Sequence, residues 1–177
     1  MYYYFCASLP ALTLGEKPAW TLDEFVEACR RVLRDVDYRA TVALLNDSGD
    51  VRSGFAHAWR QWDAQMRNAL ARWRAGRLGV DVAARLLPHQ GYDCGLEREV
   101  AEACARGNPL ERELALDRLR WLWAEEAARP APFALPAVLG FALKLRLAWR
   151  WAGMQEEQAE TVIKEFMESD PAAAAAG

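Results

Sequence analysis

The stretch GFAHAWRQWDAQMRNALARWRA, residues 54–75, decides the fold class. At the helical period of about 100° per residue, its apolar side chains fall on one stripe. The members of that stripe are Phe55, Trp59, Trp62, Met66, Ala69, Leu70 and Trp73. Arg60, Arg67 and Arg74 recur every seven residues on another face. The pattern predicts a long amphipathic helix with one solvated face and with its tryptophans in the core.

A capping signal predicts another helix closer to the N-terminus. Thr21 and Glu24 have the spacing of a capping box, and apolar residues follow at helical intervals, so we predict a helix over residues 21–36. Residues 38–45 either continue this helix or form a second one. The turn-forming residues 46–50 end that segment.

Two further helices are predicted in the second half of the chain. Asn108 and Pro109 suit the N-cap and the first position of a helix to about residue 128, and Pro130 follows its end. Residues 136–151 have helical spacing but carry three cations in their last half. Their apolar run is shorter than the roughly 20 residues that a membrane span needs, so we predict a buried helix.

The C-terminal part is predicted to hold one more helix and a tail. Gly153 interrupts the helical pattern, which predicts a separate acidic helix over residues 154–169. The apolar side of this helix is Val162, Ile163, Phe166 and Met167. The alanine-rich residues 171–177 are predicted to be a disordered tail.

These segments together predict an all-α fold. No alternation of apolar and polar residues long enough for a strand follows residue 10, and only residues 2–8 suit a short extended segment. A chain of 177 residues, of which 53% are hydrophobic, can bury a sizeable core. We predict a single domain over residues 1–170, a bundle of about five to seven helices.

Charge and cysteine content limit the functional classes. The chain has 22 basic and 25 acidic residues, so it lacks the basic excess expected of a nucleic-acid-binding protein. None of the four cysteines forms a CxxC pair, and the first residues lack the basic and apolar regions of a signal peptide. We predict a cytoplasmic protein in which Cys29 and Cys104 are buried thiols, and Cys6 and Cys94 lie outside clear helices.

No motif in the sequence indicates catalysis. His57 and His89 are 32 positions apart with no cysteine pair beside them, which disfavours a metal site. The sequence has no phosphate-binding loop and no nucleophile elbow. We predict a protein that is not an enzyme and has no cofactor or metal. An enzyme would be indicated by a deep polar pocket around His89, Tyr92 and Cys94.

The arginine face of residues 54–75 has three interpretations. Arg60, Arg67 and Arg74 could form a solvated face, bind an acidic protein partner or contact nucleic acid. The neighbouring tryptophans belong to the opposite, apolar stripe, so base stacking and charge do not converge there. Nucleic acid is therefore the least favoured of the three.

Two pairs of tryptophans, Trp121 with Trp123 and Trp149 with Trp151, are spaced two residues apart. Helical residues at this spacing point about 200° from one another, so the two members of a pair cannot enter the same core. Either each helix packs between two layers of the chain, or one member of each pair binds a protein partner, since tryptophan and arginine are enriched at interface hot spots.

The start of the chain, YYYFCASLPAL at residues 2–12, resembles the start of a bacterial family of uncharacterised proteins encoded beside genes for rotary V-type (archaeal-type) ATPases. The amphipathic helix at residues 21–27 and the segment LKLRLAWRW at residues 143–151 also agree with that family. The family is more distantly similar to the C subunit of these ATPases, called d in eukaryotes. That all-α subunit caps the membrane rotor ring and receives the central stalk.

The resemblance implies a non-catalytic accessory or C-like coupling subunit that links the rotor ring and the central stalk. Such a protein would be held at the membrane only through its partners. We expect the partner-binding residues to be Trp121, Trp123, Trp149, Trp151, Arg60, Arg67 and Arg74. The alternative is an independent adaptor or nucleic-acid-binding module that uses the arginine face of residues 54–75.

Overall fold

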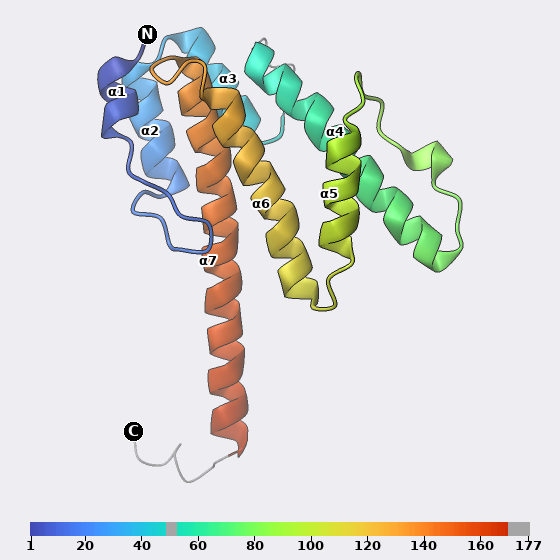
Figure 1. Ribbon diagram of the computed structural model, residues 1–177. Helices are drawn as coiled ribbons and strands as arrows, with labels where there is room; N and C mark the ends of the chain where they lie inside the picture. Colours follow the sequence, from blue (N-terminus) through green and yellow to red (C-terminus); the bar gives the residue numbers. More distant parts are fainter. Residues whose placement is uncertain (49–52, 170–177) are drawn as a thin grey trace.

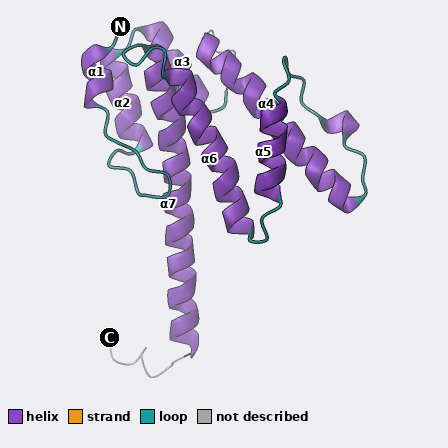
Figure 2. Cartoon of the chain, viewed as in Figure 1, coloured by secondary structure: helices purple, strands orange, loops and turns teal. Residues whose placement is uncertain are grey.

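The computed structural model describes residues 1–48 and 53–169, with side chains up to Met154. The described residues form seven α-helices and one short 3₁₀ turn, with no strand among them (Figure 2). The helices are α1 (Tyr3–Ser8), α2 (Leu22–Val32), α3 (Asp35–Leu45), α4 (Gly54–Leu78), α5 (Cys94–Cys104), α6 (Pro109–Ala128) and α7 (Leu135–Ser169), and the turn is η1 (Ala83–Arg85). The predicted all-α fold is confirmed. The predicted tail, residues 171–177, lies outside the described residues.

The capping residues begin two helices where the sequence predicts them. The hydroxyl of Thr21 accepts the N–H of Glu24 at 3.1 Å, and a carboxylate oxygen of Glu24 accepts the N–H of Thr21 at 2.7 Å. This reciprocal pair satisfies two N–H groups that the first turn of α2 would otherwise leave without partners. The side chain of Asn108 likewise accepts the N–H of Leu110 at 2.9 Å, with Pro109 as the first residue of α6.

The backbone between α2 and α3 shows that residues 38–45 belong to a second helix and do not continue the first. Leu33 and Arg34 have extended backbone with ψ of 153° and 149°. The helix predicted over residues 21–36 therefore ends early, and a separate helix begins at Asp35.

Cys29 and Cys104 are both buried, as predicted, and burial raises the pKa of the Cys29 thiol to about 12.

The short extended segment that residues 2–8 could have formed is not observed. Residues 3–8 form α1, which places Cys6 within a helix, and Cys94 is also helical as the first residue of α5, although both were expected outside clear helices. The physical reason is the spacing of Tyr2, Phe5, Cys6 and Leu9, which one helical face brings together. Phe5 is buried against residues of α2 and α7, and the other three pack around the same cluster. An extended segment would have divided these side chains between two faces.

The prediction of a helix break at Gly153 is wrong. Helix α7 runs without interruption through Gly153 for 35 residues, which at about 1.5 Å per residue is a length of roughly 52 Å. A glycine inside a helix costs only about 1 kcal/mol relative to alanine. The glutamine and glutamate residues that follow favour helix strongly enough to offset that cost.

Helix α7 is the centre of the arrangement (Figure 1). Helices α1, α2 and α3 cover one side of its N-terminal half, α6 lies alongside it, and α4 and α5 lie beyond α6. Helices α6 and α7 approach closely at Gly140, where an added Cβ atom would lie 2.9 Å from the carbonyl oxygen of Ala124. The C-terminal half of α7 extends away from the other helices.

Each side of α7 enters a different apolar cluster. Val138, Ala142 and Leu145 pack with α1 and α2, whereas Leu139 and Leu143 pack with α3, α4 and α6. A third cluster joins α4, α5 and α6 through residues such as Met66, Val100 and Leu116. In the described part of the chain, no helix is both long enough and apolar enough to cross a membrane.

Candidate functional site

The buried member of each tryptophan pair binds a carboxylate of α6. The Trp151 side chain is buried, and its indole N–H donates to Oδ2 of Asp117 at 3.0 Å. The buried Trp121 donates to Oε1 of Glu125 at 3.1 Å. The ammonium group of Lys144 lies 4.9 Å from the centre of the Trp121 ring and binds the same Glu125 oxygen.

The other member of each pair is half-buried in a different layer. Trp123 contacts Trp59 and Trp62, with ring centres 5.2 and 5.9 Å away. Trp149 donates its indole N–H to the carbonyl oxygen of Trp20 at 2.9 Å. The two tryptophans of each pair thus pack into separate layers of the same chain, and Trp123 and Trp149 keep more exposed surface than their partners. Partner binding by these four residues stays a prediction.

The prediction that the three tryptophans of α4 lie in the core is right for one of them. Trp59 is buried, and Trp62 is half-buried beside it with ring centres 5.7 Å apart. Trp73 is half-buried and packs against the cluster that joins α4, α5 and α6. The guanidinium groups of Arg77 and Arg112 lie 5.0 and 5.1 Å from the centre of its ring.

The arginine face of α4 is only partly a solvated surface. Arg67 is exposed, but its Nε lies 2.6 Å from Oδ2 of Asp63 in an ion pair, and its Nη2 donates to Oδ2 of Asp47 at 3.4 Å. Arg74 is exposed, and Arg60 is half-buried. Arg67 and Arg74 also line a cavity whose other walls belong to α6 and α7. The structure therefore joins this face to charged residues that the sequence analysis did not connect with it.

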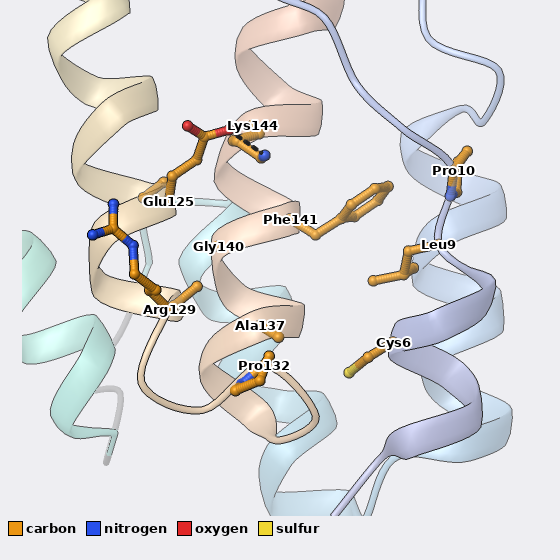
Figure 3. A pocket seen from close by; sticks show the side chains of 12 residues that line it. Cys6, Leu9, Pro10, Glu125, Arg129, Pro132, Ala137, Gly140, Phe141 and Lys144 are labelled. Carbon is orange, nitrogen blue, oxygen red and sulfur yellow. Dashed lines mark hydrogen bonds and ion pairs between the residues drawn. The ribbon is translucent and has the colours of Figure 1, made fainter.

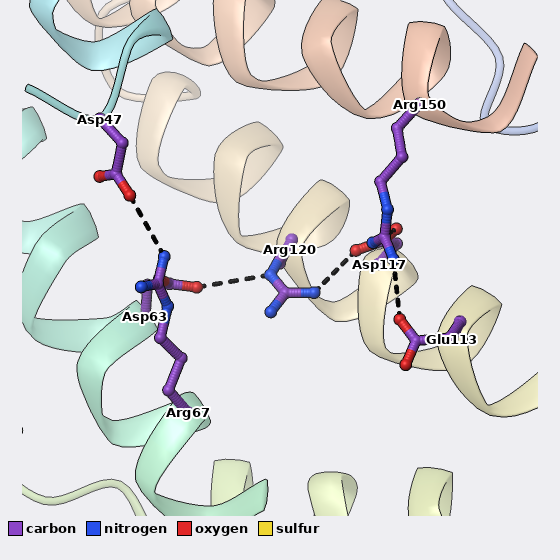
Figure 4. Close-up of polar contacts among 7 residues, drawn as sticks. All are labelled: Asp47, Asp63, Arg67, Glu113, Asp117, Arg120 and Arg150. Carbon is purple, nitrogen blue, oxygen red and sulfur yellow. Dashed lines mark hydrogen bonds and ion pairs between the residues drawn. The ribbon is translucent and has the colours of Figure 1, made fainter. Parts of the chain in front are cut away.

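A chain of alternating acidic and basic side chains crosses this region (Figure 4). It runs in the order Asp47, Arg67, Asp63, Arg120, Asp117, Arg150 and Glu113. Asp117 lies at its most buried point, with no exposed surface. The Asp117 carboxylate accepts N–H groups from Arg120 at 2.7 Å and from Arg150 at 2.5 Å, in addition to Trp151.

The cavity beside this chain has a volume of about 320 Å³ and an excess of positive charge. Five arginines line it, namely Arg67, Arg74, Arg120, Arg146 and Arg150. Three carboxylates line it, namely Asp63, Glu113 and Asp117. Its walls therefore carry two more positive than negative charges. Trp59, Leu70, Leu116 and Leu147 complete the lining.

Arg146 differs from Arg67, Arg120 and Arg150 because it binds backbone and not carboxylate. Its Nη1 donates to the carbonyl oxygens of Leu44 and Leu45 at 3.3 and 3.1 Å. Burial lowers the pKa of the Arg146 guanidinium, and the nearby Asp47 and Asp63 act in the opposite direction. Guanidinium remains charged in proteins, so Arg146 places a positive charge in a region partly shielded from water.

Sequence reasoning missed most of this cavity. Glu113, Asp117 and Arg120 recur at intervals of four and three residues on α6, and Arg146 and Arg150 are four residues apart on α7. Each set therefore marks one face of a helix. The signal was present within each helix, but only the packing of α4, α6 and α7 brings the faces together.

A second cavity, of about 350 Å³, lies between the segment after α1 and the α6–α7 hairpin (Figure 3). Its lining is mainly apolar and includes Leu9, Pro10 and Phe141, with the Glu125–Lys144 ion pair at one side. His89 and Tyr92 lie in the loop before α5, and Cys94 is the first residue of α5; none of the three lines either cavity. Among the side chains that the structure describes, no group of three or more histidine, cysteine or carboxylate residues is placed to hold a metal ion.

The fold and these contacts define an all-helical protein with an arginine-lined cavity and a projecting central helix. Residues 93–169 match the model of a family described as a protein of unknown function, DUF2764. The matched segment covers α5, α6 and α7, and thus two of the three helices that line the cavity. Searches of curated proteins and of solved structures find no match.

Proposed function

We propose that the protein is a non-catalytic accessory or C-like coupling subunit of a bacterial V-type ATPase, which links the rotor ring and the central stalk on the cytoplasmic side. The observation that carries this proposal is the form of α7. Its N-terminal half lies among the other helices, and its C-terminal half extends beyond them as one continuous helix (Figure 1). A subunit that transmits motion between partners needs such a rigid connection.

The contacts of α7 support a load-transmitting role. Leu139, Leu143 and Leu145 are at most 1% exposed, so the helix is held on several sides by close packing. Arg146 ties α7 to the end of α3, and Arg150 ties it to α6. A force on the projecting half would reach α3 and α6 through these contacts.

An aromatic surface at the opposite end of the molecule supports a second docking point. Tyr3, Tyr4 and Phe133 are 55%, 87% and 39% exposed, and the rings of Tyr3 and Phe133 have centres 4.5 Å apart. Exposed tyrosine and phenylalanine side chains are typical of protein interfaces. Tyr3 and Tyr4 also belong to the stretch that resembles the ATPase-associated family. Two separated docking points fit a linking subunit.

The alternative nucleic-acid-binding module has less support. Arg67, at the centre of the arginine face, is paired with Asp63 and Asp47. Contact with a phosphate backbone would have to replace these pairs. Binding to nucleic acid would also weaken steeply with added salt, which distinguishes it from the proposed role.

Purification of the tagged protein from its own host under mild detergent tests the proposal. Mass spectrometry should identify V-type ATPase rotor and stalk subunits in a constant ratio to the tagged chain. A variant with Tyr3→Ala and Tyr4→Ala should recover less of them, whereas the exposed substitution Arg98→Gln should recover the same amount. Recovery of the protein alone or with nucleic acid, while the ATPase elutes intact elsewhere, would contradict the proposal.

A further inference from the structure

We propose that the cavity between α4, α6 and α7 binds a phosphate dianion. This inference is separate from the proposed coupling role, because it concerns a small anion and neither of the two docking points. The cavity is lined by five arginines and three carboxylates. Two of these arginines, Arg74 and Arg146, provide the unmatched positive charge.

The three carboxylates of the cavity are already paired. Asp63 binds Arg67 and Arg120, Asp117 binds Arg120 and Arg150, and Glu113 binds Arg150. Those pairs account for Arg67, Arg120 and Arg150. Arg74 has no carboxylate within 4.0 Å in the described part of the chain, although it lines the same cavity.

Arg146 keeps hydrogen-bond donors for a ligand. The guanidinium group has five N–H donors, and the described residues accept only from Nη1, through the carbonyl groups of Leu44 and Leu45. The Nε and Nη2 groups therefore have no acceptor among the described residues. A phosphate oxygen offers the acceptors that these groups require, and guanidinium binds phosphate through paired hydrogen bonds.

The charge and size of the cavity favour a dianion over a chloride ion or a monocarboxylate. A phosphate group carries a charge of about −1.5 to −2 at pH 7. That charge matches the two positive charges that the cavity walls have in excess. The volume of about 320 Å³ is also within the range of about 300–1,000 Å³ typical of small-molecule sites.

Calorimetric titration of the full-length protein with potassium phosphate near neutral pH tests the inference. We expect saturable binding with one site per chain. Potassium chloride and potassium acetate at the same ionic strength should give no saturable binding. Absence of saturation by phosphate would overturn the inference, and so would equal binding of acetate, because a monoanion does not need the two excess charges.

Two substitutions locate the site. Arg74→Gln and Arg146→Gln each remove a charge-assisted hydrogen bond, so each should weaken phosphate binding by about tenfold or more. Arg118→Gln is the matched control, because Arg118 is exposed on α6 and does not line the cavity. It should leave the affinity unchanged. Arg146 also holds the end of α3, so circular dichroism must show that the Arg146 variant is folded. If it is misfolded, the phosphate affinity of the Arg74 variant alone tests the site. Unchanged binding by Arg74→Gln, or equal loss in Arg118→Gln, would overturn the inference.

Discussion

Asp117 is the residue on which the polar interior depends. Its carboxylate is fully buried and accepts hydrogen bonds from Arg120, Arg150 and Trp151. A buried carboxylate is tolerated only when charge and hydrogen bonds compensate for the loss of water. Here both forms of compensation come from α6 and α7, so the two helices have one favoured register.

Replacement of Asp117 by asparagine tests this dependence. The Asp117→Asn substitution keeps the size of the side chain but removes the charge that binds two arginines. We expect a loss of about 2–4 kcal/mol in the free energy of unfolding, measured by urea denaturation. The control is Glu126→Gln, whose pair with Arg129 is exposed on both sides. Its effect should stay within about 0.5 kcal/mol. Equal effects of both substitutions would contradict the importance of burial.

Asp37 gives the fold a dependence on acid pH. Burial alone would raise the pKa of this carboxyl, but hydrogen bonds from Tyr2 and Arg34 outweigh burial and hold the pKa below its ordinary value. A carboxyl with a lowered pKa in the folded state stabilises the fold above its unfolded pKa of about 3.9. That stabilisation is lost as the pH falls through the lower folded value.

The hydrogen bond from Tyr2 should account for part of this acid sensitivity. Tyr2→Phe removes the hydroxyl that donates to Asp37 while keeping the ring that packs beside α2. We expect lower stability at neutral pH and a smaller loss of stability between neutral pH and about pH 3 than in the unmodified protein. Thermal unfolding followed across this pH range measures both. An unchanged pH profile would show that the Tyr2 hydroxyl does not affect the pKa of Asp37.

At the scale of elements, the close contact of α6 and α7 depends on one glycine. Gly140→Ala would place a methyl group 2.9 Å from the carbonyl oxygen of Ala124 and 3.0 Å from the Cβ atom of Ala128. The backbone of α6 would have to move, so we expect destabilisation of about 1–3 kcal/mol in urea unfolding.

Gly76→Ala is the matched control for Gly140→Ala. Gly76 lies inside α4, and an added Cβ atom there would meet nothing within 4 Å. Alanine favours helix by about 1 kcal/mol over glycine, so this substitution should stabilise the protein. Stabilisation by both substitutions would mean that the α6–α7 contact has room for a methyl group.

The sequence predicted the start of a helix correctly where all the residues of the start signal lie within one turn of that helix. The capping box at Thr21 and the Asn108–Pro109 start fixed the beginnings of α2 and α6, because these interactions lie within one turn of helix. The errors at α1 and at Gly153 have a different origin. Phe5 needs the distant residues of α2 and α7 to favour its helix, and a single glycine has too small an effect to end a long helix.

The cavity shows the limit of prediction from one sequence. The charged residues of α4, α6 and α7 each appear at helical spacing, but no local signal shows that the three faces meet. The tryptophan pairs behaved differently. Their spacing correctly predicted that the two tryptophans of a pair pack on different sides of their helix. Only the tertiary structure showed that both sides are covered by the same chain.

At the scale of the whole molecule, the protein has a packed body and one helix that leaves it (Figure 1). The aromatic surface of Tyr3, Tyr4 and Phe133 lies near one end of α7, and the projecting half forms the other. In the proposed coupling role the two ends would bind different subunits. The continuity of α7 is then the property on which function depends.

Binding of the purified protein to the intact V-type ATPase of its host, followed by light scattering on a size-exclusion column, is the most direct test. Ala159→Pro interrupts the projecting half of α7, because proline inside a helix costs about 3 kcal/mol, while Ala159→Ser preserves the helix. We predict stoichiometric binding by the unmodified protein and by Ala159→Ser, and loss of binding by Ala159→Pro. Failure of the unmodified protein to bind, or equal binding by Ala159→Pro, would contradict the proposed role.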